Sequence, residues 1–220
     1  KYDVTTIAHL TCVGATKADI RKTVEEMKVA GIENILALRG DKPKDFVGDP
    51  FVDYHYASEL VKEIKAYGDF CVGGACYPEG HPEAKTVSAD IDALKIKAES
   101  GCEFFTTQMF FDNEVMYSFL SKFQRKGINI PVVAGIMPIT NARQLSRSVA
   151  LSGTSVPRSL REMVERFGEN PQAMKQAGIA YATDQIIDLF ANGITNVHVY
   201  SMNKPDVAAK ILENISSIRN

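Results

Sequence analysis

Reactive side chains occur near the ends of four short apolar runs in this sequence. His9 lies in the first run, Arg39 and Asp41 close the second, Tyr77 closes the third, and Gln108 lies near the end of the fourth. An imidazole, a guanidinium, a carboxylate and an amide can together move protons, bind anions and hydrogen-bond a ligand. In a (β/α) barrel the carboxyl ends of the strands meet at one mouth, where catalysis takes place. The pattern therefore predicts an enzyme with its site at the strand ends.

The elements that must position these groups are apolar runs of strand length that alternate with stretches of helical periodicity. The runs cover Thr5–Leu10, Asn34–Asp41, Cys71–Tyr77, Phe104–Met109, Pro131–Met137 and Asn196–Ser201. Helices are expected at Lys17–Ala30, Tyr54–Tyr67, Ser88–Ser100, Glu114–Lys126 and Gln172–Asn192, each followed by a glycine, with a short extra helix around Leu160–Phe167. This alternation predicts parallel strands joined by crossover helices.

The fold class expected from this alternation is α/β, a (β/α)8 TIM barrel of which the chain holds about six βα units. A complete barrel takes about 250 residues, whereas this sequence has 220. Because the sequence begins almost directly on a strand, we expect the first two units to be missing. We therefore expect residues 1–220 to form a single catalytic barrel domain that is N-terminally incomplete. An open doubly wound sheet is the alternative.

Composition excludes several classes of protein. The sequence is 45% hydrophobic with a net charge of −2, which predicts a sizeable core and no broad surface for nucleic acid. It contains neither a run of eighteen apolar residues nor a signal peptide, so we expect a cytoplasmic protein without a membrane partner. The four cysteines match no zinc spacing, and we expect no metal site. We expect them to be small buried hydrophobes in a reducing compartment.

The segment from Tyr77 to Ala84, Tyr-Pro-Glu-Gly-His-Pro-Glu-Ala, is the most distinctive motif. Prolines on both sides of His81 restrict the backbone, so this loop is expected to be stiff and to hold an imidazole and a carboxylate near a strand end. A rigid turn in which His81 caps a helix is an equally good interpretation of the composition. The non-periodic stretch at Lys42–Asp53 follows another strand end, and loops of that length are often functional.

Five motifs in this order resemble methylenetetrahydrofolate reductase, the flavoprotein family of one-carbon metabolism and methionine supply. They are Thr6–Cys12, Ala37–Asp41, Tyr77–Ala84, Thr107–Asp112 and Gly135–Pro138. The resemblance extends over essentially the whole chain. It implies a (β/α)8 barrel, bound FAD, NADH or NADPH as electron donor, and reduction of 5,10-methylenetetrahydrofolate to 5-methyltetrahydrofolate. It also implies a homo-oligomer.

The resemblance also assigns residues to the flavin. Those that match FAD contacts are His9, Arg39, Gly40, Asp41, Ala57, Tyr77, His81, Glu83, Asp90 and Lys97. Arg39 and Lys97 suit a pyrophosphate because their cations pair with phosphate oxygens, and Asp90 suits hydroxyl groups as an acceptor. Without the resemblance, a solvated helix lysine is the better interpretation of Lys97.

Catalytic roles implied by the resemblance fall on Asp41 and Gln108. A carboxylate at Asp41 disfavours an anionic reduced flavin and favours a cationic iminium, whereas the plain alternative is a loop cap. Gln108 matches a glutamine used against folate and nicotinamide, because an amide both donates and accepts; a structural amide is its alternative. Lys204 and Tyr117 are expected on the substrate side, although packing on its helix is the better interpretation of Tyr117.

Three departures from the family pattern lead to further expectations. The family's acid is a glutamate on a strand that would precede this sequence, so we expect slow methylene reduction by these residues alone. Ala93 and Ile96 stand where relatives carry polar flavin contacts, which predicts a looser phosphate site. Lys204 stands where relatives carry arginine and so loses the bidentate fork.

Other functions remain open at this stage. A catalytically impaired barrel fragment, or a subunit that only binds folate or flavin, is one alternative. A proline-dehydrogenase-like flavoprotein on the same architecture is another, although the Gln108 motif and the His81 loop argue against it. The choice between NADH and NADPH is not encoded in any fingerprint of this sequence.

Overall fold

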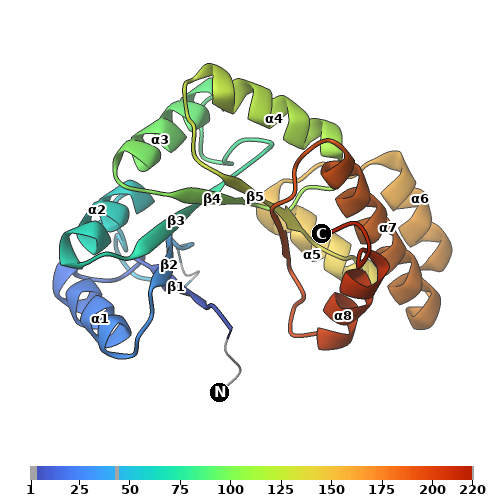
Figure 1. Cartoon of the computed structure of the whole chain (residues 1–220), viewed down its shortest axis with the longest axis horizontal. Helices are drawn as coiled ribbons and strands as arrows, with labels where there is room; N and C mark the ends of the chain where they lie inside the picture. The colour runs from blue at the N-terminus through green and yellow to red at the C-terminus, as the bar shows by residue number, and fades with distance from the viewer. Residues whose placement is uncertain (1–3, 43–44, 220) are drawn as a thin grey trace. The chain divides into compact units, whose positions relative to one another are not determined.

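Strands and helices alternate along the chain in the computed structural model, which describes residues 4–42 and 45–219 (Figure 1). The strands are β1 (Ile7–Thr11), β2 (Asn34–Leu38), β3 (Cys71–Cys76), β4 (Phe104–Thr107), β5 (Val132–Ile136) and β6 (Val197–Val199). The helices are α1 (Lys17–Val29), α2 (Ala57–Tyr67), α3 (Val87–Glu99), α4 (Asn113–Arg125), α5 (Ala142–Ser152), α6 (Arg158–Phe167), α7 (Pro171–Ala191) and α8 (Pro205–Asn214). All six predicted strands are present, which confirms an α/β fold built from six βα units.

The strand order decides between the two predicted architectures. Strands follow one another in sequence order from β1 to β6, and the pairs β1–β2, β2–β3 and β5–β6 are parallel. A doubly wound sheet reverses its order part-way, whereas a barrel does not. The barrel-type prediction is therefore confirmed, and the doubly wound alternative is wrong.

Element boundaries differ from the prediction in ways that matter for the site. β2 ends at Leu38 and β4 at Thr107, so Arg39, Asp41 and Gln108 lie in loops just past their strands. β1 runs to Thr11, which places His9 in the middle of that strand rather than at its end. The runs were predicted too long because apolar loop residues that pack against neighbouring elements continue the hydrophobic pattern.

The chain divides into two compact units. Unit 1 comprises residues 1–76, 88–106 and 126–131, and unit 2 comprises residues 77–87, 107–125 and 132–220. The expectation of one catalytic domain stays a prediction. In unit 1, Thr16 and Asp19 form a capping box that starts α1. Ile20 and Val24 of that helix are buried, as are Leu60 and Ile64 of α2.

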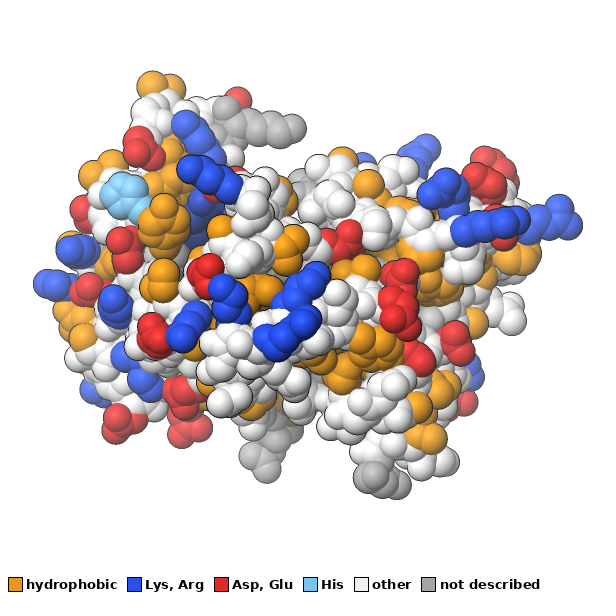
Figure 2. All heavy atoms as spheres, turned by 90° about the horizontal axis from the view of Figure 1, so that it is seen from above, with side chains coloured by type: hydrophobic (Ala, Val, Ile, Leu, Met, Phe, Trp, Pro, Cys, Tyr) orange, Lys and Arg blue, Asp and Glu red, His pale blue; other side chains and the backbone are white. Residues whose placement is uncertain are grey.

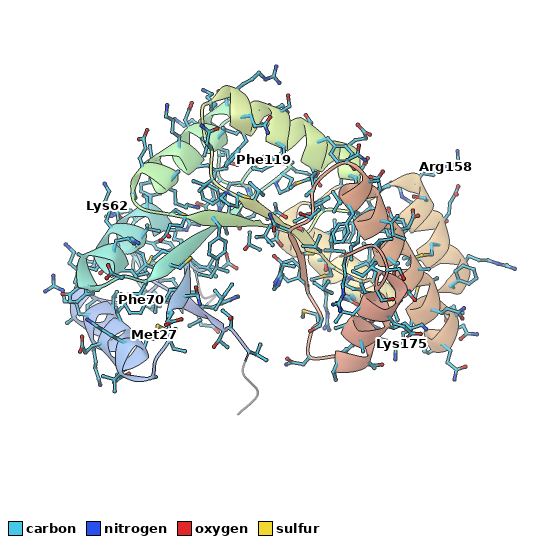
Figure 3. All side chains as sticks on the ribbon, viewed as in Figure 1. Met27, Lys62, Phe70, Phe119, Arg158 and Lys175 are labelled. Atoms are coloured by element: carbon cyan, nitrogen blue, oxygen red, sulfur yellow. The ribbon has the colours of Figure 1, made fainter. Side chains whose placement is uncertain are left out.

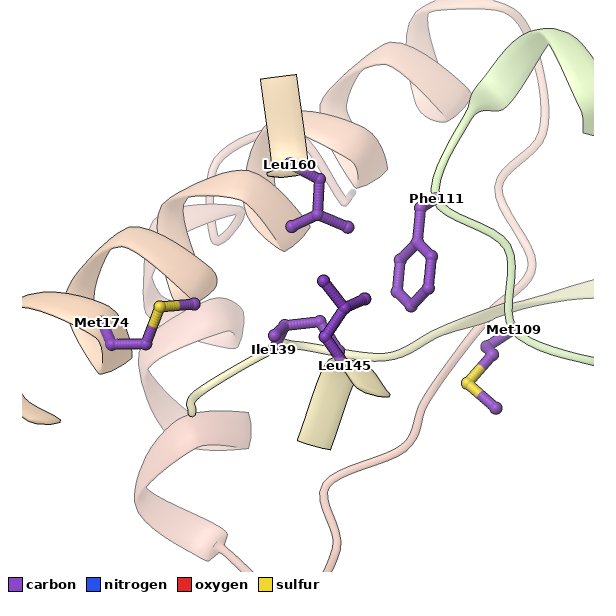
Figure 4. Close-up of a cluster of buried hydrophobic side chains, with 6 residues drawn as sticks. All are labelled: Met109, Phe111, Ile139, Leu145, Leu160 and Met174. Atoms are coloured by element: carbon purple, nitrogen blue, oxygen red, sulfur yellow. The ribbon is translucent and has the colours of Figure 1, made fainter. Parts of the chain in front are cut away.

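The core of unit 2 lies around the segment that follows β5. Ile139 and Leu145 pack with Leu160 of α6, Met174 of α7 and Phe111 (Figure 4). Gly178 of α7 lies against the Ile139 backbone so closely that an added Cβ would stand 1.9 Å from the carbonyl oxygen. A side chain there is impossible without moving the backbone, so α7 fixes the course of this segment.

Charged side chains occur on the exposed faces of helices in both units. Lys62 on α2 and Arg158 on α6 are both exposed and project from their helices (Figure 3). Side chains of both signs are interspersed with hydrophobic ones on the face drawn in Figure 2, as the small net charge predicts. Among the described residues, every helix is too short or too polar to cross a bilayer.

Candidate functional site at the strand ends

In unit 1, the loop after β2 is held tightly against the loop after β1. The Arg39 carbonyl accepts the Val13 N–H at 2.8 Å and the Cys12 thiol at 3.6 Å. Gly40 adopts φ +85, and a Cβ there would lie 2.4 Å from the Val13 side chain. Only glycine fits this position, because both the left-handed backbone and the lack of space exclude a side chain. The loop therefore turns sharply and leaves the Asp41 side chain exposed.

The guanidinium of Arg39 lies over an aromatic ring of the same unit. Its central carbon stands 4.9 Å from the centroid of the Phe51 ring. Phe51 belongs to the long loop between β2 and α2, for which the sequence predicted a functional location. Stacking on an aromatic face restricts the guanidinium without neutralising its charge. Arg39 is thus a preorganised cation directly after a strand end.

Lys97, in the last turn of α3, points into the layer between its helix and the sheet. Its ammonium donates to the Ala75 carbonyl at 2.7 Å and stands 5.6 Å from the centroid of the Phe105 ring. Gly74 makes this possible, because a Cβ at that position would lie 2.7 Å from Lys97 Cδ. Burial lowers the pKa of Lys97, while the nearby Cys76, Cys102 and Asp90 act to raise it. The interpretation of Lys97 as a solvated helix lysine is therefore wrong.

The remaining flavin candidates of unit 1 lie in different environments. Asp90 is buried in the first turn of α3, and Ala57 is buried as the first residue of α2. His9 is exposed on β1. Ala93 and Ile96, the two positions that depart from the family, are exposed on α3. The departures therefore change the outer surface of that helix and not its buried face.

In unit 2, the loop after β3 is held by its own backbone and side chains. Gly80, at φ +92, donates its N–H to the Tyr77 carbonyl at 3.0 Å. His81 Nδ1 accepts the Glu83 N–H at 3.1 Å, and the Tyr77 and His81 rings meet edge to face at 4.7 Å. His81 thus accepts a hydrogen bond from within its own loop; the expected stiffness of the loop and the helix-cap alternative stay predictions. Since Nδ1 is an acceptor, the neutral ring carries its proton on Nε2.

The Glu79 carboxylate ties this loop to a second one. Both of its oxygens accept the Ser155 N–H at 3.0 Å, in the segment between α5 and α6. Nothing in the sequence distinguished Glu79 from the other residues of the motif. Its contact is made across 76 positions of sequence, so only the folded chain reveals it.

Gln108 stands just past β4 with one end of its amide fixed. Its Oε1 accepts the Met109 N–H at 2.9 Å. Because the backbone group is a donor, the amide atom facing it must be the oxygen, which turns the NH2 group the other way. Within the described chain, that NH2 group has no hydrogen-bond partner in the protein. Gln108 therefore presents its NH2 group as a donor, and one lone pair of Oε1 is left after the Met109 bond, so the expectation of a group that both donates and accepts stays a prediction.

Three side chains from elsewhere in unit 2 hold the carbonyls of the residues after Gln108. The Met109 carbonyl accepts from Thr154 at 3.2 Å. The next two accept from α7, where Gln185 Nε2 reaches the Phe110 carbonyl at 3.0 Å and the Tyr181 hydroxyl reaches that of Phe111 at 2.7 Å. Each bond satisfies a backbone acceptor that no helix or strand serves. The segment that carries Gln108 is thereby fixed, and sequence reasoning found none of these three residues.

Lys204, just after β6, is held by the segment after β5. Its ammonium donates to Thr140 Oγ1 at 2.7 Å. Thr140 is buried, and its N–H and hydroxyl both donate to Gln144 Oε1. The predicted substrate-side lysine thus lies immediately before α8, in the connection that follows β6, within a polar network. The spacing Asn141-x-x-Gln144, typical of a helix N-terminus, was the one sequence signal for part of this network.

Tyr117 makes its contacts with α7. Its hydroxyl donates to Asp188 Oδ2 at 2.5 Å and accepts from Asn192 Nδ2 at 3.0 Å. Burial and the Asp188 carboxylate raise the pKa of Tyr117 to about 12. With both hydrogen-bonding functions of the hydroxyl used, the geometry favours the packing interpretation over a substrate contact.

Comparison with known proteins decides the family. A family model described as methylenetetrahydrofolate reductase matches residues 1–216. The chain belongs to the methylenetetrahydrofolate reductase family. The 5,10-methylenetetrahydrofolate reductase of Pectobacterium carotovorum subsp. carotovorum is 34% identical over 207 residues, which cover 94% of this chain and 68% of that protein. Methylenetetrahydrofolate reductase (NADH) 1 of Arabidopsis thaliana is 35% identical over 230 residues, and the match covers 98% of this chain and 38% of that protein.

A solved structure supports the fold. An uncharacterized protein from Clostridium thermocellum, described as binding two copies of 5-methyl-5,6,7,8-tetrahydrofolic acid, superimposes with a TM-score of 0.67. The match covers 98% of this chain and 73% of that one at 17% sequence identity. At that identity the likeness concerns the architecture alone.

The residues of unit 1 fit the dinucleotide flavin that the family implies. A pyrophosphate needs cations, and unit 1 places Arg39 after β2 and the Lys97 ammonium on the Ala75 carbonyl near the end of β3. Gly40 allows the loop after β2 to turn tightly against Val13 directly after Arg39. Asp90 adds a carboxylate at the start of α3 for hydroxyl groups. The chemistry of this donor set matches the group.

Proposed function

We propose that this protein is a flavin-dependent reductase that converts 5,10-methylenetetrahydrofolate to 5-methyltetrahydrofolate. The observation that carries the proposal is the match of the family model to residues 1–216, which includes every candidate site residue. Bound FAD supplies the chemistry of hydride transfer, and NADH or NADPH supplies the hydride. The substrate class is a reduced folate.

In this proposal the residues of the chain have separate tasks. Arg39 and Lys97 hold the anionic part of the flavin dinucleotide, and Asp41 provides a negative charge that stabilises a cationic folate. The Gln108 NH2 group, oriented by the Met109 N–H, donates to an acceptor atom on the ring of the bound ligand. The carbonyl contacts of Thr154, Gln185 and Tyr181 keep that donor in place.

The test begins with the visible spectrum of the purified protein. We expect flavin bands that bleach when NADH or NADPH is added without oxygen, and tight binding of 5-methyltetrahydrofolate by calorimetry. A colourless protein that takes up neither added FAD nor folate contradicts the proposal. Bleaching by one nucleotide and not the other also identifies the donor.

Replacing Gln108 sharpens the assignment. We expect Gln108→Leu to retain the flavin but to slow oxidation of the reduced flavin by the folate substrate by about 100-fold, the scale seen when a donor to the reacting ligand is lost. Stopped-flow absorbance measures this rate. Gln124→Leu, at an exposed position of α4, is the matched control and should behave as wild type. Equal rates for both variants exclude Gln108 from the site.

A further inference from the structure

Glu79 is a half-buried carboxylate that bonds a backbone group rather than a cation. Both of its oxygens stand 3.0 Å from the Ser155 nitrogen. Among residues 4–42 and 45–219, Glu79 takes part in no ion pair and in no other hydrogen bond. A hydrogen bond to a carboxylate is about twice as strong as one between neutral groups, so this contact is a firm anchor.

The anchor belongs to the loop that carries two of the flavin candidates. The Gly80 N–H donates to the Tyr77 carbonyl at 3.0 Å, so Glu79 is the third residue of a four-residue turn. Buried Pro78 occupies the second position, where its ring presets the backbone. Tyr77 begins this turn, and His81, whose ring meets that of Tyr77, follows it. Glu79 therefore extends from the same turn as both rings.

Ser155, on the other side of the contact, lies in the short connection between α5 and α6. Its neighbour Thr154 is buried and donates to the Met109 carbonyl at 3.2 Å. The Thr154 hydroxyl also lies 2.6 Å from that of Ser152, which has the Ser148 carbonyl as another acceptor at 2.8 Å. Two protons serve three contacts here, so Thr154 donates to Met109 only while Ser152 donates to Thr154. The bond to Met109 thus depends on how the connection is held.

Met109 joins this connection to Gln108. Its carbonyl accepts from Thr154, and its N–H bonds Gln108 Oε1 at 2.9 Å. Because both groups belong to one residue, a movement of the Met109 backbone also changes the direction of the Gln108 NH2 group. A continuous series of contacts therefore runs from Glu79 through Ser155, Thr154 and Met109 to Gln108, entirely within unit 2.

We propose that Glu79 is a positioning residue that couples the Tyr77–Ala84 loop to the Gln108 amide. This inference rests on the proposed function, under which that loop contacts the flavin and Gln108 donates to the folate. Hydride transfer needs reacting atoms about 3–3.5 Å apart, and a misplacement of about 1 Å can cost 100-fold in rate. A bond between the element that holds the cofactor and the element that orients the substrate preserves this geometry.

The test is a double-mutant cycle between Glu79 and Gln108 on the purified, flavin-loaded full chain. Stopped-flow absorbance measures oxidation of the reduced flavin by 5,10-methylenetetrahydrofolate. Glu79→Ala alone should slow this step about tenfold, with flavin content unchanged. In the Gln108→Leu background it should add no further loss, because Glu79 acts through that side chain. Glu79→Gln, which keeps an oxygen acceptor for the Ser155 N–H, should retain most of the rate.

A matched control separates this coupling from the general effect of losing a carboxylate. Glu165 is exposed on α6 of the same unit, and Glu165→Ala should leave the rate at the wild-type value. Equal slowing by Glu79→Ala in both backgrounds, or no slowing in either, overturns the inference while leaving the proposed function intact.

A second readout does not depend on the activity. In spectra of 15N-labelled protein, the Gln108 side-chain NH2 signals are identified by their absence from Gln108→Leu. Glu79→Ala should shift these signals, whereas Glu165→Ala should not, and unshifted signals in Glu79→Ala overturn the inference. If wild type neither holds flavin nor reacts with folate, the proposed function fails, and these spectra still decide whether Glu79 positions Gln108.

Discussion

Each unit of the chain holds a lysine on a neutral oxygen, but the two lysines differ in their surroundings. In unit 1, Lys97 reaches the Ala75 carbonyl beneath α3, where burial lowers its pKa. In unit 2, Lys204 reaches the Thr140 hydroxyl past the end of β6. A backbone carbonyl is fixed by the sheet, whereas a hydroxyl must itself be oriented, as Gln144 does here. The comparison indicates that a lysine between helix and sheet needs only space to reach a backbone carbonyl that the sheet already fixes. A lysine on a loop needs further hydrogen bonds to orient the hydroxyl that accepts from it.

A glycine leaves the space that each lysine arrangement needs: Gly74 beside Lys97, and Gly178 beside the segment that carries Thr140. Substituting these glycines should change the free energy of unfolding more than any other variant considered below. Gly178→Ala would place a Cβ 1.9 Å from the Ile139 carbonyl oxygen, whereas Gly74→Ala would place one 2.7 Å from Lys97 Cδ. Backbone cannot yield as a flexible side chain can, so we expect Gly178→Ala to lower the free energy of unfolding by about 3 kcal/mol and Gly74→Ala by about 1 kcal/mol. Urea denaturation measures both.

Gly68 of unit 1 provides a control for the effect of a glycine-to-alanine change that creates no steric clash. Gly68 follows α2 with an extended φ of 165, and an added Cβ would meet only ordinary contacts of 3.5 Å or more. Gly68→Ala should therefore change stability by less than about 0.5 kcal/mol. If Gly178→Ala proves as mild as this control, α7 does not hold the segment that carries Thr140.

Removing the charge of Lys97 tests the cost of burying it. At pH 7 we expect Lys97→Met to be more stable than wild type by about 1 kcal/mol, because a buried cation is replaced by an apolar chain of similar length. The folded pKa of Lys97 is lowered from its ordinary value, by burial first. Between that lowered value and about 10.4 the unfolded chain holds more protons, so wild-type stability rises with pH.

The difference between wild type and Lys97→Met should therefore shrink from pH 7 towards pH 10.5. Cys102, whose pKa is raised to about 11 by burial, acts in the opposite direction. It is present in both proteins, so the subtraction removes most of its effect. Denaturation curves across this pH range check the trend, and a gap that does not change with pH would show that the ammonium is hydrated in the folded state.

Two tyrosine hydroxyls, one in each unit, extend the comparison from charged to neutral groups. Their replacement should give the smallest changes in stability. The Tyr54 hydroxyl of unit 1 is buried without a hydrogen-bond partner among the described residues, whereas the Tyr117 hydroxyl of unit 2 bonds Asp188 and Asn192. We expect Tyr54→Phe to raise stability and Tyr117→Phe to lower it, each by about 1 kcal/mol. Thermal unfolding of the two variants compares them directly. Changes of the same sign would contradict the expected contrast between an unpaired and a hydrogen-bonded hydroxyl.

The sequence located the strands well because burial imposes a short apolar run on each. Hydrophobic runs around Val72 and Phe105 mark β3 and β4, and glycines after the helices mark their ends. It did not separate Gln108 from β4, since Met109, Phe110 and Phe111 continue the apolar pattern. Those residues are apolar because they pack in the core of unit 2, and their backbone is held by side chains more than 40 positions away.

The sequence by itself determined the order of βα units, the family and the types of reactive group near the strand ends. Those features depend on local periodicity and on motifs that are contiguous in the chain. Only the tertiary structure decided that Lys97 reaches the Ala75 carbonyl, that Gln108 presents a donor, and that Thr140 receives Lys204. Each of these depends on which distant atom a flexible side chain meets, and that is settled when the elements pack. Orientation and burial are properties of the packed chain, whereas residue type and spacing are not.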